Sequence, residues 1–261
     1  MDTIIVIPAR YGSSRFPGKP LAPIMGRSLL ERVWRIGTAV PGVTKVVVAT
    51  DDTRILEHVR SFGGEAVMTS ESCTNGSERA YEALTHLGGK ADVVVNLQGD
   101  AVLMPPWVIG ALVEAMRDDA SIEIATPAVR LNAEQYAKMS AMKGAGVVSG
   151  TTVTFAQNGN AMYFSKGIIP FVRSAPANGE PPIFQHIGVY AYRTEALKRY
   201  IGLPQGMFEA VEQLEQLRAL EHGMPIRVVQ VSLLGRTMWS VDNPQDVARV
   251  EEIIRAEGEL V

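Results

Sequence analysis

Three basic side chains near the start of the chain are spaced to bind a phosphate group. Arg10, Arg15 and Lys19 stand within ten residues of one another and directly follow the apolar run 4–7. Guanidinium and ammonium groups form charge-assisted hydrogen bonds to phosphate oxygens. Close backbone approach and further donors are offered by Gly12, Gly18, Ser13 and Ser14. A solvated basic loop is the alternative, and the pattern G-x-x-x-x-G-K-[ST] is absent, but a position after a buried strand favours phosphate binding.

Two aspartates far apart in the chain are candidate ligands for a divalent metal ion. Asp100 follows the apolar run 93–97, and Asp242 precedes a helix that we predict to begin near Asn243. Mg²⁺ prefers hard oxygen ligands and commonly bridges protein carboxylates to phosphates. The alternative for Asp242 is a helix N-cap, whereas Asp246 fits a first-turn residue that complements the helix dipole.

Further polar residues stand where a nucleotide can be contacted. Gln98 can form two-way hydrogen bonds to a base or a sugar hydroxyl, or it can be a satisfied amide at a strand end. Ser77 and Arg79 belong to the first turn of a predicted helix, from which either side chain could contact a nucleotide. For Arg79 the alternative is a surface ion pair with Glu78 or Glu82.

Bulk properties exclude several classes of protein. The 261 residues can bury a sizeable core without a disulfide or a structural metal. With 20% charged residues and a formal net charge of -3, no extended basic field is available for nucleic acid. The single cysteine, Cys73, excludes an internal disulfide and fits a reducing compartment, so we expect a cytoplasmic protein. Neither a signal peptide nor a run of about 20 apolar residues is present, so we expect no membrane contact.

The elements that must position these residues alternate in the first half of the chain. Short β-branched runs at 4–7, 45–50 and 93–97 are typical of parallel strands covered on both faces. Helical spacing lies between and after them, at 29–40, 54–62 and 77–87. This order predicts a Rossmann-like α/β sheet, and such sheets bind ligands at the carboxyl ends of their strands.

The second half has a different pattern. Strand-like runs at 153–155, 161–164 and 187–192 lack a helix between each pair, which predicts an antiparallel or mixed extension. Glycine and proline predict loops at 139–150 and 174–182. Apolar residues at 208, 211, 214 and 217 predict one helix whose stripe faces the core, with Glu215 and Arg218 as a possible surface pair. No interdomain linker is visible, so we expect one domain over 1–261.

Several motifs, in order, resemble the 3-deoxy-manno-octulosonate cytidylyltransferases. Residues 7–21, I-P-A-R-Y-G-S-S-R-F-P-G-K-P-L, match the family's opening I-P-A-R-x-x-S-x-R-x-P-G-K-P-L almost residue for residue. Further matches are A-T-D-D at 49–52, G-S-E-R at 76–79, N-L-Q-G-D at 96–100, H-I-G-V-Y-A-Y-R at 186–193, L-E-Q-L-R at 214–218 and V-D-N-P-Q-D at 241–246. The resemblance therefore covers essentially the whole chain.

The resemblance implies a nucleotidyltransferase (nucleotide-diphospho-sugar transferase) fold, with a mixed, mostly parallel central sheet and a small antiparallel extension. It implies transfer of CMP from CTP to the anomeric hydroxyl of a 3-deoxy-2-ulosonic acid such as Kdo, with release of pyrophosphate and with Mg²⁺ as cofactor. It also implies a homodimer, formed partly through residues 150–200, and a role in lipopolysaccharide or capsule precursor synthesis.

Carried onto this sequence, the family's site residues form four groups. Catalytic charge stabilisation is implied for Arg10, Arg15, Lys19 and Asp100. Nucleotide binding is implied for Pro8, Ala9, Arg10, Ser13, Ser14, Lys19, Ser77, Arg79 and Gln98. Binding of the acidic sugar is implied for Gln98, Lys166, His186, Tyr190, Glu215 and Gln216, with His186 as a binding group and not a proton donor. The metal ligands are Asp100 and Asp242.

One departure from the family bears on the substrate. The family continues Q-G-D with Glu-Pro, whereas Asp100 here is followed by Ala101 and Val102, so a carboxylate is missing beside the metal position. A different acid sugar, such as an amino-octulosonate or a sialic-like acid, or a catalytically impaired nucleotide-binding paralogue are therefore alternatives. Cys73 stands where many family members have His, and no role is assigned to it.

Overall fold

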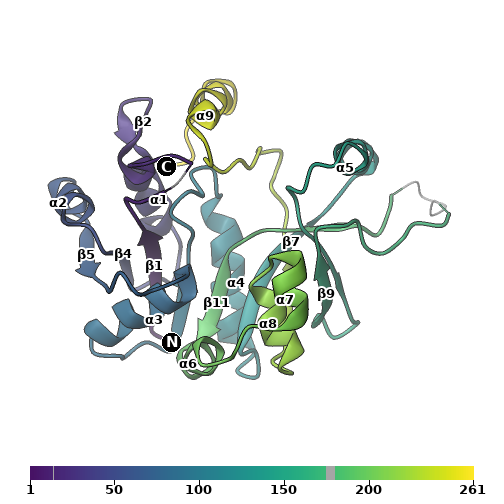
Figure 1. The fold of residues 1–261 in the computed structure, drawn as a ribbon, viewed down its shortest axis with the longest axis horizontal. Helices are drawn as coiled ribbons and strands as arrows, with labels where there is room; N and C mark the ends of the chain where they lie inside the picture. Colours follow the sequence, from purple (N-terminus) through teal and green to yellow (C-terminus); the bar gives the residue numbers. More distant parts are fainter. Residues whose placement is uncertain (14, 175–179) are drawn as a thin grey trace.

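The computed structural model describes residues 1–13, 15–174 and 180–261, and one mixed sheet runs through it (Figure 1). The strands of this sheet are β1 (Thr3–Ala9), β4 (Lys45–Thr50), β5 (Glu65–Met68), β6 (Val93–Asn96), β7 (Ile124–Arg130), β8 (Thr152–Phe155), β9 (Ala161–Ser165), β10 (Phe184–His186), β11 (Tyr190–Arg193) and β12 (Ile226–Gln230). Their order is β5-β4-β1-β6-β11-β7-β10-β8-β9, with β12 paired to β7. A two-stranded sheet is formed by β2 (Pro23–Ile24) and β3 (Arg27–Ser28).

Helices cover both faces of the large sheet. They are η1 (Lys19–Leu21), α1 (Leu29–Thr38), α2 (Thr53–Ser61), α3 (Gly76–His86), α4 (Pro106–Asp118), α5 (Ala133–Gly144), α6 (Thr194–Ile201), α7 (Met207–Glu212), α8 (Gln216–Glu221) and α9 (Pro244–Glu257). Within the described ranges, none of them is both long and apolar enough to span a bilayer.

The alternation of side chains along β1 divides the core into two clusters. Ile5 and Ile7 pack on one face with α1, α2, α4 and α9, whereas Ile4 and Val6 pack on the other with α3, α6 and α8. Successive strand residues point to opposite faces, so a strand covered on both faces is apolar throughout. This confirms the predicted buried parallel strands.

The predicted fold class is confirmed. In the first half, β5, β4, β1 and β6 pair in parallel, as expected for β-α-β units. Beyond β6, β11 pairs antiparallel with both β6 and β7, and β10, β8 and β9 continue the sheet as the antiparallel extension. Figure 1 shows the extension beside the parallel half, with α7 and α8 packed against one face of the sheet.

The predicted strand over 187–192 is wrong in its bounds. It is split into β10, which ends at His186, and β11, which begins at Tyr190, and both strands pair with β7. The Thr126 hydroxyl of β7 donates to the carbonyl of Val189, and the Val189 amide donates to the carbonyl of Ile187 in a tight local turn. The break depends on the hydrogen bond from the Thr126 side chain to the Val189 carbonyl, and the spacing of apolar residues gives no sign of such a contact.

The predicted loop at 139–150 is partly wrong, because α5 extends to Gly144. Its start is stabilised by a capping box between Asn132 and Gln135, in which each side chain accepts a hydrogen bond from the other residue's backbone amide. The first glycine of this segment, Gly144, is the last residue of the helix, so the glycines lie at its end and do not interrupt it. The predicted loop at 174–182 lies partly outside the described residues.

The single helix predicted around 208–218 is also wrong. Gln213 adopts a left-handed conformation with φ of 54°, which ends α7, and α8 begins at Gln216. Leu214 and Leu217 are buried as predicted, but Val211 is 78% exposed and Phe208 is 44% exposed. The four apolar residues therefore do not share one buried face, because the chain changes direction between them.

Close approach of two strands fixes the loop after β6. A Cβ atom on Gly99 would lie 2.5 Å from the carbonyl oxygen of Pro8 in β1, which is closer than any real Cβ contact. The carboxyl ends of the parallel strands β1 and β6 therefore meet at this glycine, and Asp100 follows it directly.

We predict that Gly99→Ala lowers the free energy of unfolding by about 1–3 kcal/mol, because the clash is with backbone that cannot rotate away. Urea denaturation followed by circular dichroism measures this change. Gly144→Ala is the matched control, since nothing lies within 4 Å of a Cβ at that position. Equal stability of the two variants would contradict the proposed close approach.

Candidate active site

The cations after β1 contact both candidate metal-binding aspartates. Lys19 Nζ donates to Asp100 Oδ2 at 2.8 Å and to the Val241 carbonyl at 2.9 Å. Arg15 Nη2 lies 3.1 Å from Asp242 Oδ1. The Lys19 side chain is only 17% exposed, whereas that of Arg15 is 66% exposed. The loop after β1, the loop after β6 and the start of α9 thus converge on two cation–carboxylate pairs.

The basic loop has a definite shape. The carbonyl of Tyr11 accepts hydrogen bonds from the amides of Ser13 and Gly18, and Gly18 has a positive φ of 71°. A Cβ at Gly18 would lie 3.2 Å from the Tyr11 hydroxyl oxygen, so the turn requires glycine there on both counts. Ser13 Oγ accepts from the amide of Phe16, and Arg10 is exposed. Ser14 lies outside the described residues.

The predicted nucleotide contacts gather beside this loop. A Cβ on Gly76 would lie 3.4 Å from Pro8 Cγ, 3.4 Å from Asn96 Nδ2 and 3.5 Å from Gln98 Nε2. Pro8 and Ala9 are the last residues of β1. Ser77 is buried and accepts a hydrogen bond from Asn96 Nδ2, while Asn96 Oδ1 has no partner among the residues that the structure describes. The start of α3 therefore approaches the ends of β1 and β6 closely.

Arg79 differs from both readings of the sequence. It is 1% exposed, and its guanidinium donates to Asp51 at 2.7 Å and to Thr69 at 2.6 Å. The predicted surface pair with Glu78 or Glu82 is wrong, because the side chain points into the protein. A buried, fully paired Arg79 supports the neighbouring loops from within, and its predicted direct contact with a nucleotide gains no support from this position.

The start of α9 frees Asp242 from a capping role. Asn243 is the N-cap residue, so the N-cap reading of Asp242 is wrong. Asp246 Oδ2 accepts from the amides of Asp242 and Asn243, which places Asp246 in the first turn as predicted. The Asp242 carboxylate is thereby left to contact Arg15.

The aspartates fit a particular kind of metal site. Across the described ranges, no group of three or more His, Cys, Asp or Glu residues could hold a metal ion. Asp100 and Asp242 lie at the same edge of the sheet, because the amide of Val241 donates to the Asp100 carbonyl at 3.4 Å. Mg²⁺ is commonly bound by one or two carboxylates together with waters and substrate phosphates. The residues present fit such a shared site and not one built by protein alone.

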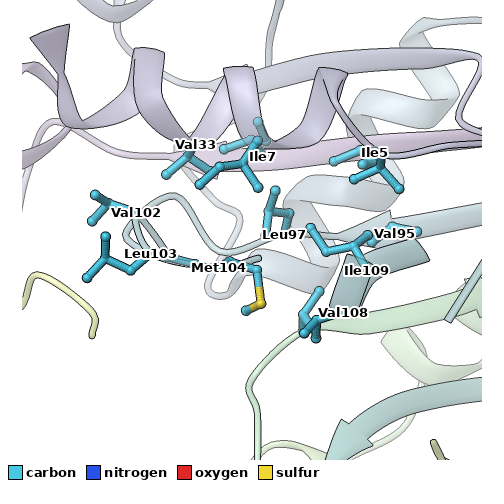
Figure 2. Close-up of a cluster of buried hydrophobic side chains, with 14 of the residues drawn as sticks. Ile5, Ile7, Val33, Val95, Leu97, Val102, Leu103, Met104, Val108 and Ile109 are labelled. Atoms are coloured by element: carbon cyan, nitrogen blue, oxygen red, sulfur yellow. The ribbon is translucent and has the colours of Figure 1, made fainter. Parts of the chain in front are cut away.

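The departure at Ala101 is accommodated by the core. Ala101 is 7% exposed and belongs to a hydrophobic cluster that also includes Val102, Leu103 and Met104. Figure 2 shows these last three residues in the same cluster as Leu97. The loop after Asp100 is therefore anchored by apolar packing.

His186 and Tyr190 lie next to each other at the junction of β10 and β11. Their ring centroids are 5.5 Å apart, and His186 Nε2 lies 2.8 Å from Thr126 Oγ1. Because that hydroxyl donates to Val189, it accepts from a protonated Nε2 of the neutral imidazole. Burial, helped by the charge of Lys166, lowers the pKa of His186 to about 3. Burial likewise raises the pKa of Tyr190. Both groups are therefore neutral at pH 7.

The remaining predicted sugar contacts, Lys166, Glu215 and Gln216, lie at α7 and α8. Lys166 follows β9, and its amide donates to Glu212 Oε2 at 2.8 Å. Gln216 is buried, and in the described part of the chain its Nε2 has no hydrogen-bond partner. A cavity of about 250 Å³ is lined by Thr74, Asn75, Gln205, Glu209, Gln213, Glu215 and Arg218. Desolvation by the surrounding protein raises the pKa of Glu215, while Arg218 lowers it.

Sequence reasoning missed several residues that shape the site. Asp51, Asn96 and Thr126 hold Arg79, Ser77 and His186 respectively. Arg218 was expected as a possible partner of Glu215, but it pairs with Glu209. Asp51 and Arg218 stand inside motifs already singled out, A-T-D-D and L-E-Q-L-R, so the motifs marked the right segments without revealing the pairings.

Comparisons with known proteins agree on one family. A family model described as cytidylyltransferase matches residues 4–226. A 3-deoxy-manno-octulosonate cytidylyltransferase of Maricaulis maris (strain MCS10) is 57% identical over 261 residues, 100% of both chains. An enzyme of the same name from Chlamydia pneumoniae is 41% identical over 249 residues, 95% of this chain and 92% of its own.

Solved structures extend the comparison. The structure of CMP:2-keto-3-deoxy-manno-octonic acid synthetase complexed with CTP is 36% identical, covers 98% of this chain and 100% of its own, and superposes with a TM-score of 0.86. The 4-diphosphocytidyl-2C-methyl-D-erythritol synthase of Anaerococcus prevotii DSM 20548 is 12% identical, with a TM-score of 0.61 over 97% of this chain and 96% of its own. At that identity, only the fold is shared.

We predict that His186 destabilises the folded protein in acid. Its pKa is lowered from 6.5 to about 3 on folding, so the unfolded chain binds the proton more tightly below pH 6.5. The free energy of unfolding should fall as the pH decreases from about 6.5 toward 3, and His186→Gln should make that fall smaller. Urea denaturation across this pH range measures both. An imidazole that is protonated at pH 5 by NMR would contradict the burial argument.

Proposed function

The chain belongs to the 3-deoxy-manno-octulosonate cytidylyltransferase family, and we propose that it transfers CMP from CTP to the anomeric hydroxyl of 3-deoxy-manno-octulosonate (Kdo), with release of pyrophosphate. The observation that carries the residue assignments is the convergence of Lys19 and Arg15 on Asp100 and Asp242. These facing opposite charges support a site in which a triphosphate and a divalent cation replace them.

In the proposed reaction, the anomeric oxygen attacks the α-phosphorus of CTP in line with the leaving group. The new bond joins that oxygen to the α-phosphorus, and the bond from the α-phosphorus to the oxygen that bridges to the β-phosphorus breaks. The hydroxyl proton passes to solvent, and pyrophosphate leaves. Such transfers depend mainly on positioning and on charge neutralisation, so no enzyme nucleophile is required. Arg10, Arg15 and Lys19 would stabilise the negative charge on the phosphates.

The ion pairs suggest how the site accepts a highly charged ligand. Lys19 and Arg15 are neutralised by Asp100 and Asp242 before any nucleotide binds. On binding, the two cations would turn to phosphate oxygens, and the two carboxylates would hold Mg²⁺. Mg²⁺, when bound, supplies positive charge at the phosphates and can lower the pKa of the attacking hydroxyl. Exchange of partners avoids leaving the half-buried charges of Lys19 and Asp100 unpaired.

The remaining residues divide between the two substrates. The residues proposed to contact the nucleotide are Pro8, Ala9, Ser13, Ser14, Ser77 and Gln98. Arg79 supports them from inside the protein. The residues proposed to bind the acidic sugar are Gln98, Lys166, His186, Tyr190, Glu215 and Gln216. His186 and Tyr190 would act as neutral hydrogen-bonding groups, and Lys166 would pair with the sugar carboxylate.

The alternatives raised by Ala101 are not favoured. A relative named for the Kdo reaction is 57% identical along the full chain. Apolar packing of Ala101, Val102, Leu103 and Met104 holds the loop that bears Asp100, so the missing carboxylate does not leave this loop without support. Neither a different acid sugar nor an inactive paralogue is needed to explain the substitution.

We further propose a cytoplasmic homodimer built from a single domain over 1–261. An exposed apolar patch formed by Met207, Phe208 and Val211 on α7 supports dimerisation, because monomeric proteins rarely expose large contiguous apolar patches. The rings of Tyr163 and Phe208 are 5.9 Å apart, which joins β9 to α7 within this patch. The β9 strand lies within residues 150–200. A role in lipopolysaccharide or capsule precursor synthesis belongs to this proposal and rests on the family alone.

We predict that Lys19→Ala and Asp100→Asn each lower kcat by about 10²–10³, because each removes charge from the site of phosphoryl transfer. Pyrophosphate release with CTP, Kdo and Mg²⁺ measures the rate, and thermal unfolding checks that both variants fold. Asp118→Asn, in an exposed pair with Arg117, is the control and should turn over normally. Near-normal turnover of both site variants would remove these residues from the mechanism.

A further inference from the structure

A buried ion pair, formed by residues to which no substrate contact has been assigned, lies beside the proposed sugar contacts. Arg218 donates from Nε and Nη2 to the two carboxylate oxygens of Glu209, at 2.8 and 2.6 Å. The side chains are 12% and 4% exposed. Such a bidentate pair is strong and geometrically specific, and loss of either partner leaves an uncompensated charge.

This pair bridges the break between two helices. Glu209 belongs to α7 and Arg218 to α8, and the chain between them reverses at Gln213. The segment enclosed by the pair carries Glu215 and Gln216, the two proposed sugar contacts. The pair therefore fixes the backbone from which both side chains project.

A second contact holds the same segment. The Tyr200 hydroxyl donates to the Glu215 carbonyl at 2.8 Å, and the Arg218 guanidinium lies 5.5 Å from the centroid of the Tyr200 ring. Glu209, Glu215 and Arg218 all line the cavity of about 250 Å³. Arg218 thus lies next to both Glu209 and Tyr200, the two residues that hold this segment in place.

Glu209 also decides which carboxylate Arg218 meets. Glu215 and Arg218 are three residues apart at the start of α8, a spacing at which opposite charges pair readily. In this structure Glu209 accepts from Nε and Nη2 of the Arg218 guanidinium, and within the described ranges no residue donates a hydrogen bond to the Glu215 carboxylate. Gln216 Nε2, in a side chain 7% exposed, is likewise unpaired, and unpaired buried donors in native folds call for a partner.

We propose that Glu209 and Arg218 are positioning residues for the acidic sugar. By holding Arg218, Glu209 keeps the Glu215 carboxylate free to accept hydrogen bonds from sugar hydroxyls and keeps Gln216 oriented beside it. The inference rests on the proposed function. The pair sets affinity for the sugar and not for CTP, because the cation–carboxylate pairs of the nucleotide side lie on η1, the loops after β1 and β6, and the residues before α9.

The first experiment is steady-state kinetics of Glu209→Gln in the full chain. Arg218 loses its partner and turns to Glu215, so KM for Kdo should rise about tenfold, while KM for CTP changes less than about twofold. Glu123→Gln is the control, since it removes an ion pair of the same 2.6 Å length with Arg199 on the surface. A lower melting temperature with an unchanged KM for Kdo would show a structural role only and overturn the proposal.

Two further variants separate the proposal from its premise. The neutral pair Glu209→Gln with Arg218→Gln should restore KM for Kdo toward the native value, because no cation remains to capture Glu215. Glu215→Gln alone should raise KM for Kdo, and adding Glu209→Gln to it should raise it no further. Additive effects, or no recovery in the neutral pair, overturn the positioning role. A native KM in Glu215→Gln removes Glu215 from the proposed sugar site itself.

Discussion

Compensation of charge at one edge of the sheet is the constraint on which the rest of the structure depends. A site for a triphosphate needs cations and a site for Mg²⁺ needs carboxylates, and without substrates each would repel its own kind. Here Lys19 contacts Asp100 and Arg15 contacts Asp242, so the cations and the carboxylates neutralise each other in the absence of substrates. Such a site can be assembled on folding at little electrostatic cost, and we propose that its substrates bind by exchange of partners.

The fold brings these groups together through close backbone approach. Parallel strands β1 and β6 end at the same edge. The loop that carries Asp100 approaches β1 so closely that a Cβ atom on Gly99 would lie 2.5 Å from the Pro8 carbonyl oxygen. Apolar packing of Val102, Leu103 and Met104 anchors that loop, and Asp246 organises the start of α9 so that Asp242 faces Arg15. On the proposed sugar side, His186 is neutral, and the break between α7 and α8 is bridged by the pair of Glu209 and Arg218.

The part of this arrangement that could be predicted follows from periodicity and local chemistry. Buried strands such as β4, the basic loop and the two aspartates at strand and helix ends were visible because each depends on residues close in the chain. What could not be predicted depends on long-range contacts. Arg79 is neutralised by Asp51 from another loop, α7 ends where Gln213 turns left-handed, and Arg218 selects Glu209 over its neighbour Glu215. In each case the spacing of residues in the sequence is compatible with more than one contact, and the folded structure determines which one forms.

Calorimetric titration of the protein with CTP, with and without Mg²⁺, tests the exchange of partners most directly. If Asp100 and Asp242 hold the cations in the free protein, CTP alone must compete with two carboxylates and also meet their repulsion. Exchange of partners predicts that Mg²⁺ strengthens CTP binding at least about tenfold, a difference of about 1.4 kcal/mol. Equal affinity with and without Mg²⁺ would contradict the claim that the aspartates turn from the cations to the metal.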